Sequence, residues 1–599
     1  MSERPTRSRT CSSRAILLCL GAWVSTACAG GPSTRDLARA VAEAEQLASE
    51  QEAFAPTGGV VEPTWYRGPG VVEGRTGPAR FARTVRESFD IARAMARVEW
   101  LDSQYRAPAN DDYEAALDRL AVELESHGFG REGSGLELEV LEGDPVAAWT
   151  PVRGSIHLIE SGFEPALLHA FDDRSDPDRV LLPIHAPSAS LEGTVVLGLD
   201  EVTDGTILVT REPLRRVQDR ARERGAVAVV SASTASFNVD PTGRERHLDA
   251  IQFQQLSSTQ ELPVFQISAR AHDRIAAAVA RGDARLRLEA TVETEQRPCR
   301  TLVARVKGKL APEIEDEGAK RRVVAIAAHL QEPGANDNGT GVSALIELAC
   351  VLAEGIESRT LQRPNHGIAF VLGDEMDQTR AFLEATDEIV IAGISADMVG
   401  ASFAETGAIA LLERAPDPGA IAVYPPDEHT PWGAREVDAS ELIPNGLAVI
   451  ARCATIDTGL IDGGWAAADH PFEGGSDHDV FLARGIPAML FWHFTDFTYH
   501  TSLDRFGMVD GEELARSATA ILSTALAVAD AKPFDLERYL RSLDLEVRTR
   551  ARAAAEAFDP ETQQAWRDWG REARYWLRAL CLGISLDEAR PPQAVSRPD

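Results

Sequence analysis

The sequence has few cysteines and little positive charge for its length. Only seven of its 599 residues are cysteine, and no two have the CxxC spacing of a thiolate zinc site. The 93 Asp and Glu residues outnumber the 61 Lys and Arg residues, which gives a formal net charge of −32. Such a field repels phosphate backbones, so we do not expect nucleic acid to be a partner.

Long apolar runs are also scarce. The run 15–24 follows an arginine-rich start and is too short for a permanent membrane span, but it fits the apolar region of a signal peptide. The next residues, Val-Ser-Thr-Ala-Cys at 24–28, resemble the lipobox of bacterial lipoproteins. That resemblance implies an exported protein anchored in a bacterial membrane by a lipid on Cys28 and facing the periplasm. Cleavage by ordinary signal peptidase near Ala27, giving a soluble periplasmic or secreted chain, is the alternative.

The length predicts more than one folded unit, because a single hydrophobic core stops growing at roughly 250–300 residues. Hydrophobic residues make up 44% and charged residues 26%, as in globular proteins. We find no internal repeats. The expected segments are a signal peptide at 1–28, a tether and N-terminal arm at 29–80, the first part of the main domain at 81–146, an inserted β-rich domain at 147–295, the rest of the main domain at 296–531, and a helical extension at 532–599.

The main domain reads as an α/β fold. From 301 to about 531, apolar strands alternate with helical segments, which predicts a sheet with helices on both faces. In open α/β sheets, ligands bind just beyond the carboxyl ends of the strands. The expected strands are 323–328, 367–372, 389–396 and 486–492, and each is followed by residues that can bind a cation.

These strand ends carry two histidines and several carboxylates. The candidate ligands are His329, Asp337, Glu375, Asp397 and His500. Imidazole and carboxylate groups form the nitrogen and oxygen ligand set that zinc favours. A purely structural role for Asp337 would be that of a helix N-cap, but capping does not explain the other four residues.

Three blocks make a specific resemblance possible. They are Gly-Ala-Asn-Asp-Asn-Gly-Thr-Gly at 334–341, Asp-Met-Val-Gly at 397–400 and Tyr-His-Thr-Ser-Leu-Asp at 499–504. They resemble the M28 family of zinc aminopeptidases. The resemblance implies two zinc ions bridged by Asp337, with His329 and Asp397 completing one site and Glu375 and His500 the other. A bridging water activated by the metals would then attack the peptide carbonyl.

The sequence departs from that family in two places. The family has adjacent glutamates, a general base and then a ligand, where this chain has Asp374 and Glu375, so the base would be one methylene shorter. Strict counting from the preceding strand would instead put Met376 and Asp377 in those positions. The family also has an aspartate two positions after the first histidine, where Gln331 stands here. Gln331 can donate or accept a hydrogen bond but carries no charge, which the neighbouring Glu332 could supply.

Three more residues are candidates for the surroundings of the site. Asp477 and His478 precede a helix, so a purely structural role for them would be to cap it. The M28 resemblance places such a pair near the metals. They and Tyr499 are therefore expected to support the ligands or to contact substrate, as is Gln331.

Residues 147–295 change to short β-rich runs, with helices expected at 214–224 and from Ala269. This succession resembles the protease-associated domain that is inserted in many exopeptidases. An unrelated small β-rich domain is the alternative.

The function expected from these features is zinc-dependent hydrolysis of peptides from one end, by an aminopeptidase rather than a carboxypeptidase. Two rivals stay open. A pseudo-peptidase that binds peptides without cleaving them is favoured by Asp374 and Gln331. A glutaminyl cyclase would use a related site for intramolecular acyl transfer, but the large insert favours a peptidase.

Overall fold

The structure is a computed structural model. It describes the backbone of β1 (Trp65–Tyr66) and residues 75–282, 284–310, 320–426, 430, 432–433 and 435–590. The predicted signal peptide, its lipobox-like end with Cys28, and most of the tether lie outside the described residues. The four cysteines within them are free thiols.

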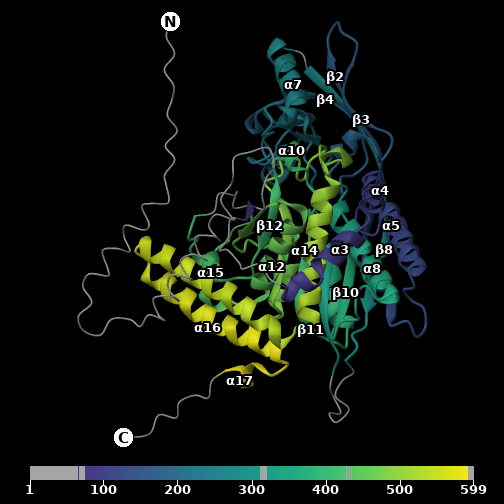
Figure 1. Cartoon of the computed structure of the whole chain (residues 1–599). Coiled ribbons are helices and arrows are strands. Elements are labelled where there is room, and N and C mark those ends of the chain that lie inside the picture. The colour runs from purple at the N-terminus through teal and green to yellow at the C-terminus, as the bar shows by residue number, and fades with distance from the viewer. Residues whose placement is uncertain are drawn as a thin grey trace, which may run out of the picture. The chain divides into compact units, whose positions relative to one another are not determined.

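One large sheet organises the main domain (Figure 1). Its strands, in spatial order, are β13 (Ala466–His470), β12 (Ile409–Glu413), β14 (Ala488–Phe494), β11 (Ile389–Ala396), β9 (Arg322–His329), β10 (Gly367–Gly373) and β8 (Ala284–Val306). The four strands expected from the sequence are neighbours and run parallel, in the order β14, β11, β9 and β10. Their carboxyl ends therefore meet at one edge of the sheet.

Helices cover both faces of this sheet, so its central strands are apolar throughout. On one face, α8 (Gly339–Ser358) and α14 (Gly511–Ala529) contact β9 and each other. On the other, Val323, Ala325 and Ala327 of β9 pack in one cluster with Phe382 of α9 (Asp377–Ala385) and Phe481 of α13 (His478–Ala483). The predicted α/β class with two covered faces is confirmed.

Of the described helices, α8 is the one whose length and hydropathy would suit a membrane span. Its most apolar window is 89% buried within the protein. This is the environment of a core helix, and the sheet and α14 provide it.

The inserted region is a smaller sheet with two helices. It contains β3 (Ala166–Phe171), β4 (Ala189–Val196), β5 (Thr206–Thr210), β6 (Ala228–Ser231), β7 (Val264–Gln266), α6 (Leu214–Glu223) and α7 (Ala269–Arg281). The pairs β4–β5, β5–β6 and β6–β7 are parallel. Both helices begin where the sequence predicts.

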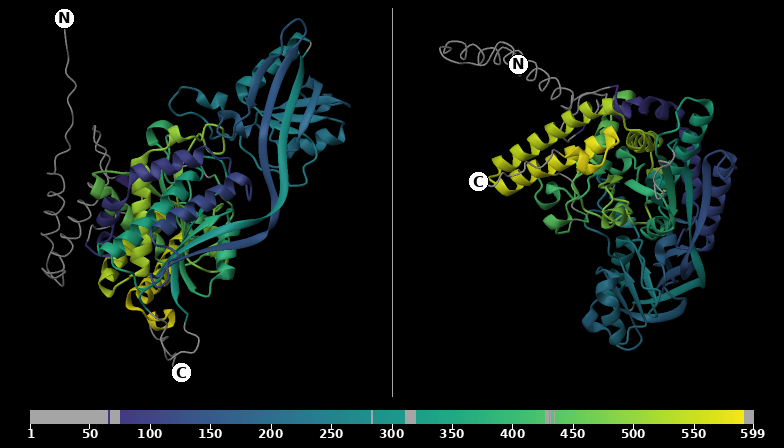
Figure 2. Two further views of the ribbon diagram at one scale, coloured as in Figure 1. Left: turned by 90° about the vertical axis from the view of Figure 1, so that its right-hand side faces the viewer. Right: turned by 90° about the horizontal axis from the view of Figure 1, so that it is seen from below.

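Two long strands join the inserted region to the main sheet. β2 (Leu136–Glu160) and β8 pair antiparallel from Leu136 opposite Val306 to Glu160 opposite Ala284, and Figure 2 shows them running side by side from one sheet to the other. One end of β8 pairs with β10, and the other end pairs with β4. Both strands continue through the boundaries expected at 147 and 295, so the two regions share a continuous hydrogen-bonded ribbon.

Further helices lie at the two ends of the described chain. Three precede the ribbon, α3 (Ala82–Ser88), α4 (Ile91–Asp102) and α5 (Asp111–Ser126), and α4 and α5 pack on α8. The C-terminal region is helical as expected, with α15 (Leu536–Glu556), α16 (Pro560–Leu582) and α17 (Leu586–Ala589). Arg538 of α15 forms a buried ion pair at 2.7 Å with Asp457 of α12 (Leu447–Asp462), which fastens the extension to the main domain.

Candidate metal centre

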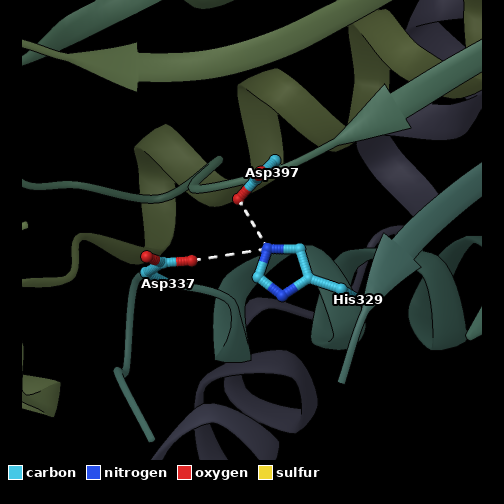
Figure 3. Close-up of side chains that lie close together, drawn as sticks. All are labelled: His329, Asp337 and Asp397. Atoms are coloured by element: carbon cyan, nitrogen blue, oxygen red, sulfur yellow. Dashed lines mark hydrogen bonds and ion pairs between the residues drawn. The ribbon is translucent and has the colours of Figure 1, made fainter. Parts of the chain in front are cut away.

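Three of the expected ligands meet at the carboxyl edge of the sheet. His329 ends β9, Asp397 directly follows β11, and Asp337 lies in the turn before α8. His329 Nε2 is 3.1 Å from Asp397 Oδ1 and 3.4 Å from Asp337 Oδ1 (Figure 3). The other ring nitrogen, Nδ1, lies 3.1 Å from the backbone oxygen of Gln331, which fixes the orientation of the ring. We call His329, Asp337 and Asp397 the strand-end triad.

A second group shares Asp337. His500 Nε2 is 3.1 Å from Glu332 Oε2 and 3.2 Å from Asp337 Oδ2. We call Glu332, Asp337 and His500 the loop triad. In each triad the potential ligand atoms all lie within 4.8 Å of one another. Among the described residues these two triads are the clusters with that geometry, and neither includes Glu375.

The turn that carries Asp337 is held by the side chain of Asp504. The carboxylate of Asp504 accepts hydrogen bonds from the backbone N–H groups of Asn336, at 2.8 Å, and Asp337, at 2.9 Å. Gly334 is required at this crossing, because a Cβ there would lie 2.2 Å from Asp504 Oδ2. Asn338, whose side chain accepts from Gly341 N–H, is the N-cap of α8. Capping is therefore not the role of Asp337, whose side chain faces the two histidines.

The inserted region holds the loop that carries His500. The backbone oxygen of His500 accepts hydrogen bonds from Phe253 N–H and from the Gln252 side chain, both at 2.7 Å. Asn238 donates from its side chain to the backbone oxygens of Phe497 and Tyr499. The inserted region thus supports one ligand of the loop triad directly.

Glu375 and Asp374 differ in whether they line the pocket. Glu375 lines the same pocket as both triads, and its N–H donates to the Gln331 side chain at 2.8 Å. Gln331 therefore positions the Glu375 turn. Asp374 is not among the residues that line this pocket. Burial raises the pKa of Asp374 to about 7, and the positive charge of His329 opposes that rise.

The other expected residues are spread over three environments. Asp477 is buried and accepts hydrogen bonds from Met376 N–H and from the side chains of Gln378 and Thr379, so it fixes the Glu375 turn instead of capping α13. His478 lies 3.0 Å from Glu413 and does not line the pocket. Tyr499 lines the pocket and stacks on His500, with ring centroids 3.8 Å apart.

Several residues of the pocket have no counterpart in the sequence prediction. Ser476 Oγ donates to Asp397 Oδ2 at 2.9 Å. Beside the predicted Tyr499, a wall of large side chains faces the triads, formed by Met398, Trp432, Leu490 and Trp492. The presence of Ser476 directly before Asp477 was a signal for the first of these contacts. The wall of large side chains had no sequence signal, since its members come from separate loops and strands.

The pocket concentrates negative charge. Burial and the adjacent Glu332 raise the pKa of Asp337 well above its usual range, and burial likewise raises the pKa of Glu375. Burial by itself lowers the pKa of both histidines, but the facing carboxylates outweigh it and raise both pKa values well above the usual range. Burial opposes ionisation of Glu332, yet His500 draws its pKa down to about 2.

This arrangement fits divalent cations. Four carboxylates and two imidazoles share one pocket, and buried charges of one sign persist when they are paired or coordinate a metal. Asp337 Oδ2 is buried and lies 3.2 Å from His500 Nε2, but it makes no well-directed hydrogen bond, so it can bind a cation. The donor set of carboxylate oxygen and imidazole nitrogen is one that zinc favours.

Comparisons with known proteins agree with this geometry. Residues 310–379 match the model of peptidase family M28. The chain is 26% identical over 432 residues to the Probable lipoprotein aminopeptidase LpqL of Mycobacterium tuberculosis, covering 68% of this chain and 75% of that protein.

Solved structures similar to this chain include BSAP, a zinc aminopeptidase from Bacillus subtilis, with 15% identity and a TM-score of 0.49 over 74% of this chain and 96% of that one. A Peptidase M28 precursor from Shewanella amazonensis gives 19% identity and a TM-score of 0.49 over 76% and 96%.

The family match covers His329, Asp337 and Glu375, and the fold brings Asp397 and His500 to the same pocket. The resemblance read from the three sequence blocks is therefore confirmed. Over residues 310–379 the chain matches peptidase family M28, and this match supports a metallopeptidase.

Proposed function

We propose that this chain is a zinc-dependent exopeptidase, specifically an aminopeptidase, that holds two zinc ions in the two triads. The observation that carries the proposal is the convergence of both triads on the shared, buried Asp337. Asp337 would contact both ions, His329 and Asp397 would complete the first site, and His500 with a glutamate would complete the second. Glu375 is the glutamate that the M28 resemblance puts there.

The chemistry divides between the metals and the chain. Zinc ions bound in the triads would activate a water and polarise the scissile carbonyl. A pocket glutamate that is not bound to a metal would accept a proton from that water and return it to the leaving amine, and Glu332 and Glu375 both line the pocket. Asp374, the base expected from the sequence, does not line the pocket, so one of these two glutamates is better placed for this task.

The pocket also suits one end of a peptide. Its carboxylates would attract a free α-amino group, and its wall of Met398, Trp432, Leu490 and Trp492 would bind an apolar side chain. The similarity to LpqL, named as an aminopeptidase, supports the same choice. We therefore expect a preference for peptides with an apolar N-terminal residue.

Localisation at a membrane is part of the proposal. The arginine-rich start, the apolar run and the lipobox-like end at Cys28 support export and lipidation, and LpqL is named as a lipoprotein. Metabolic labelling with a radioactive fatty acid tests this point. Label that is lost in Cys28→Ser would support lipidation, and an unlabelled wild type would contradict it.

The activity is tested with leucine p-nitroanilide and its N-acetylated counterpart. An aminopeptidase cleaves only the first, and a chelator abolishes the cleavage until zinc is restored. Cleavage of neither compound, together with tight zinc and peptide binding, would favour a pseudo-peptidase. Ammonia release from a peptide with N-terminal glutamine, without hydrolysis, would favour a glutaminyl cyclase.

A further inference from the structure

Glu332 lies where a metal ligand would be expected, although the M28 resemblance assigns it no such role. Its Oε2 is 3.1 Å from His500 Nε2, and its side chain is only 15% exposed. Together with Asp337 and His500 it forms a complete three-ligand cluster. Glu375 lines the same pocket but belongs to neither triad.

The cluster contains a buried carboxylate oxygen that makes no well-directed hydrogen bond. Asp337 is 3% exposed, and its Oδ2 has no hydrogen-bond partner although His500 Nε2 lies 3.2 Å away. Buried carboxylate oxygens are normally paired, because leaving one unpaired is unfavourable. A cation bound by Glu332, Asp337 and His500 would satisfy this oxygen.

The backbone holds Glu332 in an uncommon conformation. Its φ of +84° lies in the left-handed region, which side chains other than glycine rarely adopt. Its N–H donates to the backbone oxygen of Arg106 at 2.7 Å. The Arg106 side chain donates in turn to the backbone oxygens of Leu330 and Gly334, on both sides of Glu332. Such imposed conformations cluster at functional sites.

We propose that Glu332, in place of Glu375, is the carboxylate that completes the second zinc site with Asp337 and His500. This inference rests on the proposed two-zinc function. It also gives each of the two glutamates that line the pocket a separate role. Glu375 is then free to take the proton of the attacking water. The water oxygen bonds to the carbonyl carbon, the C–N bond breaks, and the proton passes from Glu375 to the leaving nitrogen.

The test counts zinc ions by elemental analysis and measures their dissociation constants by competition with a chromophoric chelator. The purified full-length chain is compared with Glu332→Gln and Glu375→Gln. Glu405→Gln is the matched control, because Glu405 is a partly buried glutamate that pairs with Arg246 outside the pocket. Far-UV circular dichroism checks that each variant is folded.

We expect two zinc ions in the wild type, in Glu375→Gln and in Glu405→Gln. In Glu332→Gln, one ion should bind as in the wild type, and the dissociation constant of the second should rise at least about 100-fold, since loss of an outer-shell partner alone costs roughly 10–100-fold. Glu375→Gln should lose activity although both ions remain. Glu405→Gln should keep its activity.

Two results would overturn the assignment. If the wild type and Glu332→Gln both bind two ions with the same affinities, Glu332 is not a ligand while the two-zinc function stands. If the wild type binds fewer than two ions, the proposed function fails and this inference fails with it. Should Glu332→Gln not fold, Glu332→Asp replaces it, and unchanged affinity for the second ion in that variant also refutes the proposal.

Discussion

The two triads share Asp337 but are built in different ways. In the strand-end triad, His329 and Asp397 sit at the ends of neighbouring parallel strands, β9 and β11, in the middle of a covered sheet. In the loop triad, Glu332 and His500 stand on loops that depend on Arg106 and on the inserted region for their position. His500 is 30% exposed and His329 only 2%. The strand-end triad is therefore preformed by the sheet, whereas the loop triad depends on contacts between distant segments.

Replacement of the shared residue should have the largest effect, because it damages both triads. Asp337→Asn should abolish zinc-induced thermal stabilisation and reduce kcat/KM by more than about 100-fold, the upper range for an outer-shell partner. Thermal melts with and without zinc measure this stabilisation. Equal zinc stabilisation in Asp337→Asn and wild type would contradict the shared role.

Removal of one histidine at a time separates the triads. His500→Ala should lose one zinc ion and keep the other with wild-type affinity, since the strand-end triad is intact. His329→Ala should lose the other ion. Elemental analysis after dialysis counts the ions, and Co²⁺ absorption spectra report which site is filled. Loss of both ions in His500→Ala would show that the strand-end triad is not independently formed.

A smaller effect is expected at the outer contact of the strand-end triad. Ser476 Oγ donates to Asp397 Oδ2, so Ser476→Ala should lower the affinity of this triad for its ion by about 10-fold. Chelator competition measures the affinity. Ser476→Thr keeps the hydroxyl group and is the matched control. If Ser476→Ala instead lowered the affinity of the loop triad for its ion, the assignment of Asp397 to the strand-end triad would be wrong.

The smallest effect is expected at the contact with the inserted region. Gln252→Ala removes one of the two hydrogen bonds to the backbone oxygen of His500, and the bond from Phe253 N–H remains. The affinity of the loop triad for its ion should therefore fall by less than about 10-fold, and the affinity of the strand-end triad should not change. Gln254→Ala is the control, because the Gln254 side chain accepts from Gln266 within the inserted region. An equal response in both variants would point to a general loss of stability.

Much of the main domain was predictable because its signals are local. The strand of β9 is a continuous apolar run that ends in His329, and β10, β11 and β14 give similar runs. The strands β12 and β13 were not predicted. They are short, and β12 pairs antiparallel with β14 but parallel with β13, a placement that no local pattern specifies.

The site was predictable to a similar degree. His329 and Asp397 were named from their positions at strand ends and Asp337 from the turn before a helix, and the structure brings the three together. The place of Glu332 beside His500 could not be predicted, because the two residues are 168 positions apart and meet through a left-handed backbone conformation and contacts with Arg106. Asp374 shows the converse, since its neighbour Glu375 is the one that lines the pocket.

The sequence by itself determined the α/β class, the strands whose carboxyl ends meet at one edge, and the candidate ligands His329, Asp337 and Asp397 carried near that edge. Periodicity and short spacing encode these features locally. Tertiary structure decided which glutamate faces His500, where the side chain of Asp374 points, and that the inserted region supports the His500 loop. Those outcomes depend on hydrogen bonds between residues far apart in the chain, whose geometry is set only when the whole domain has folded.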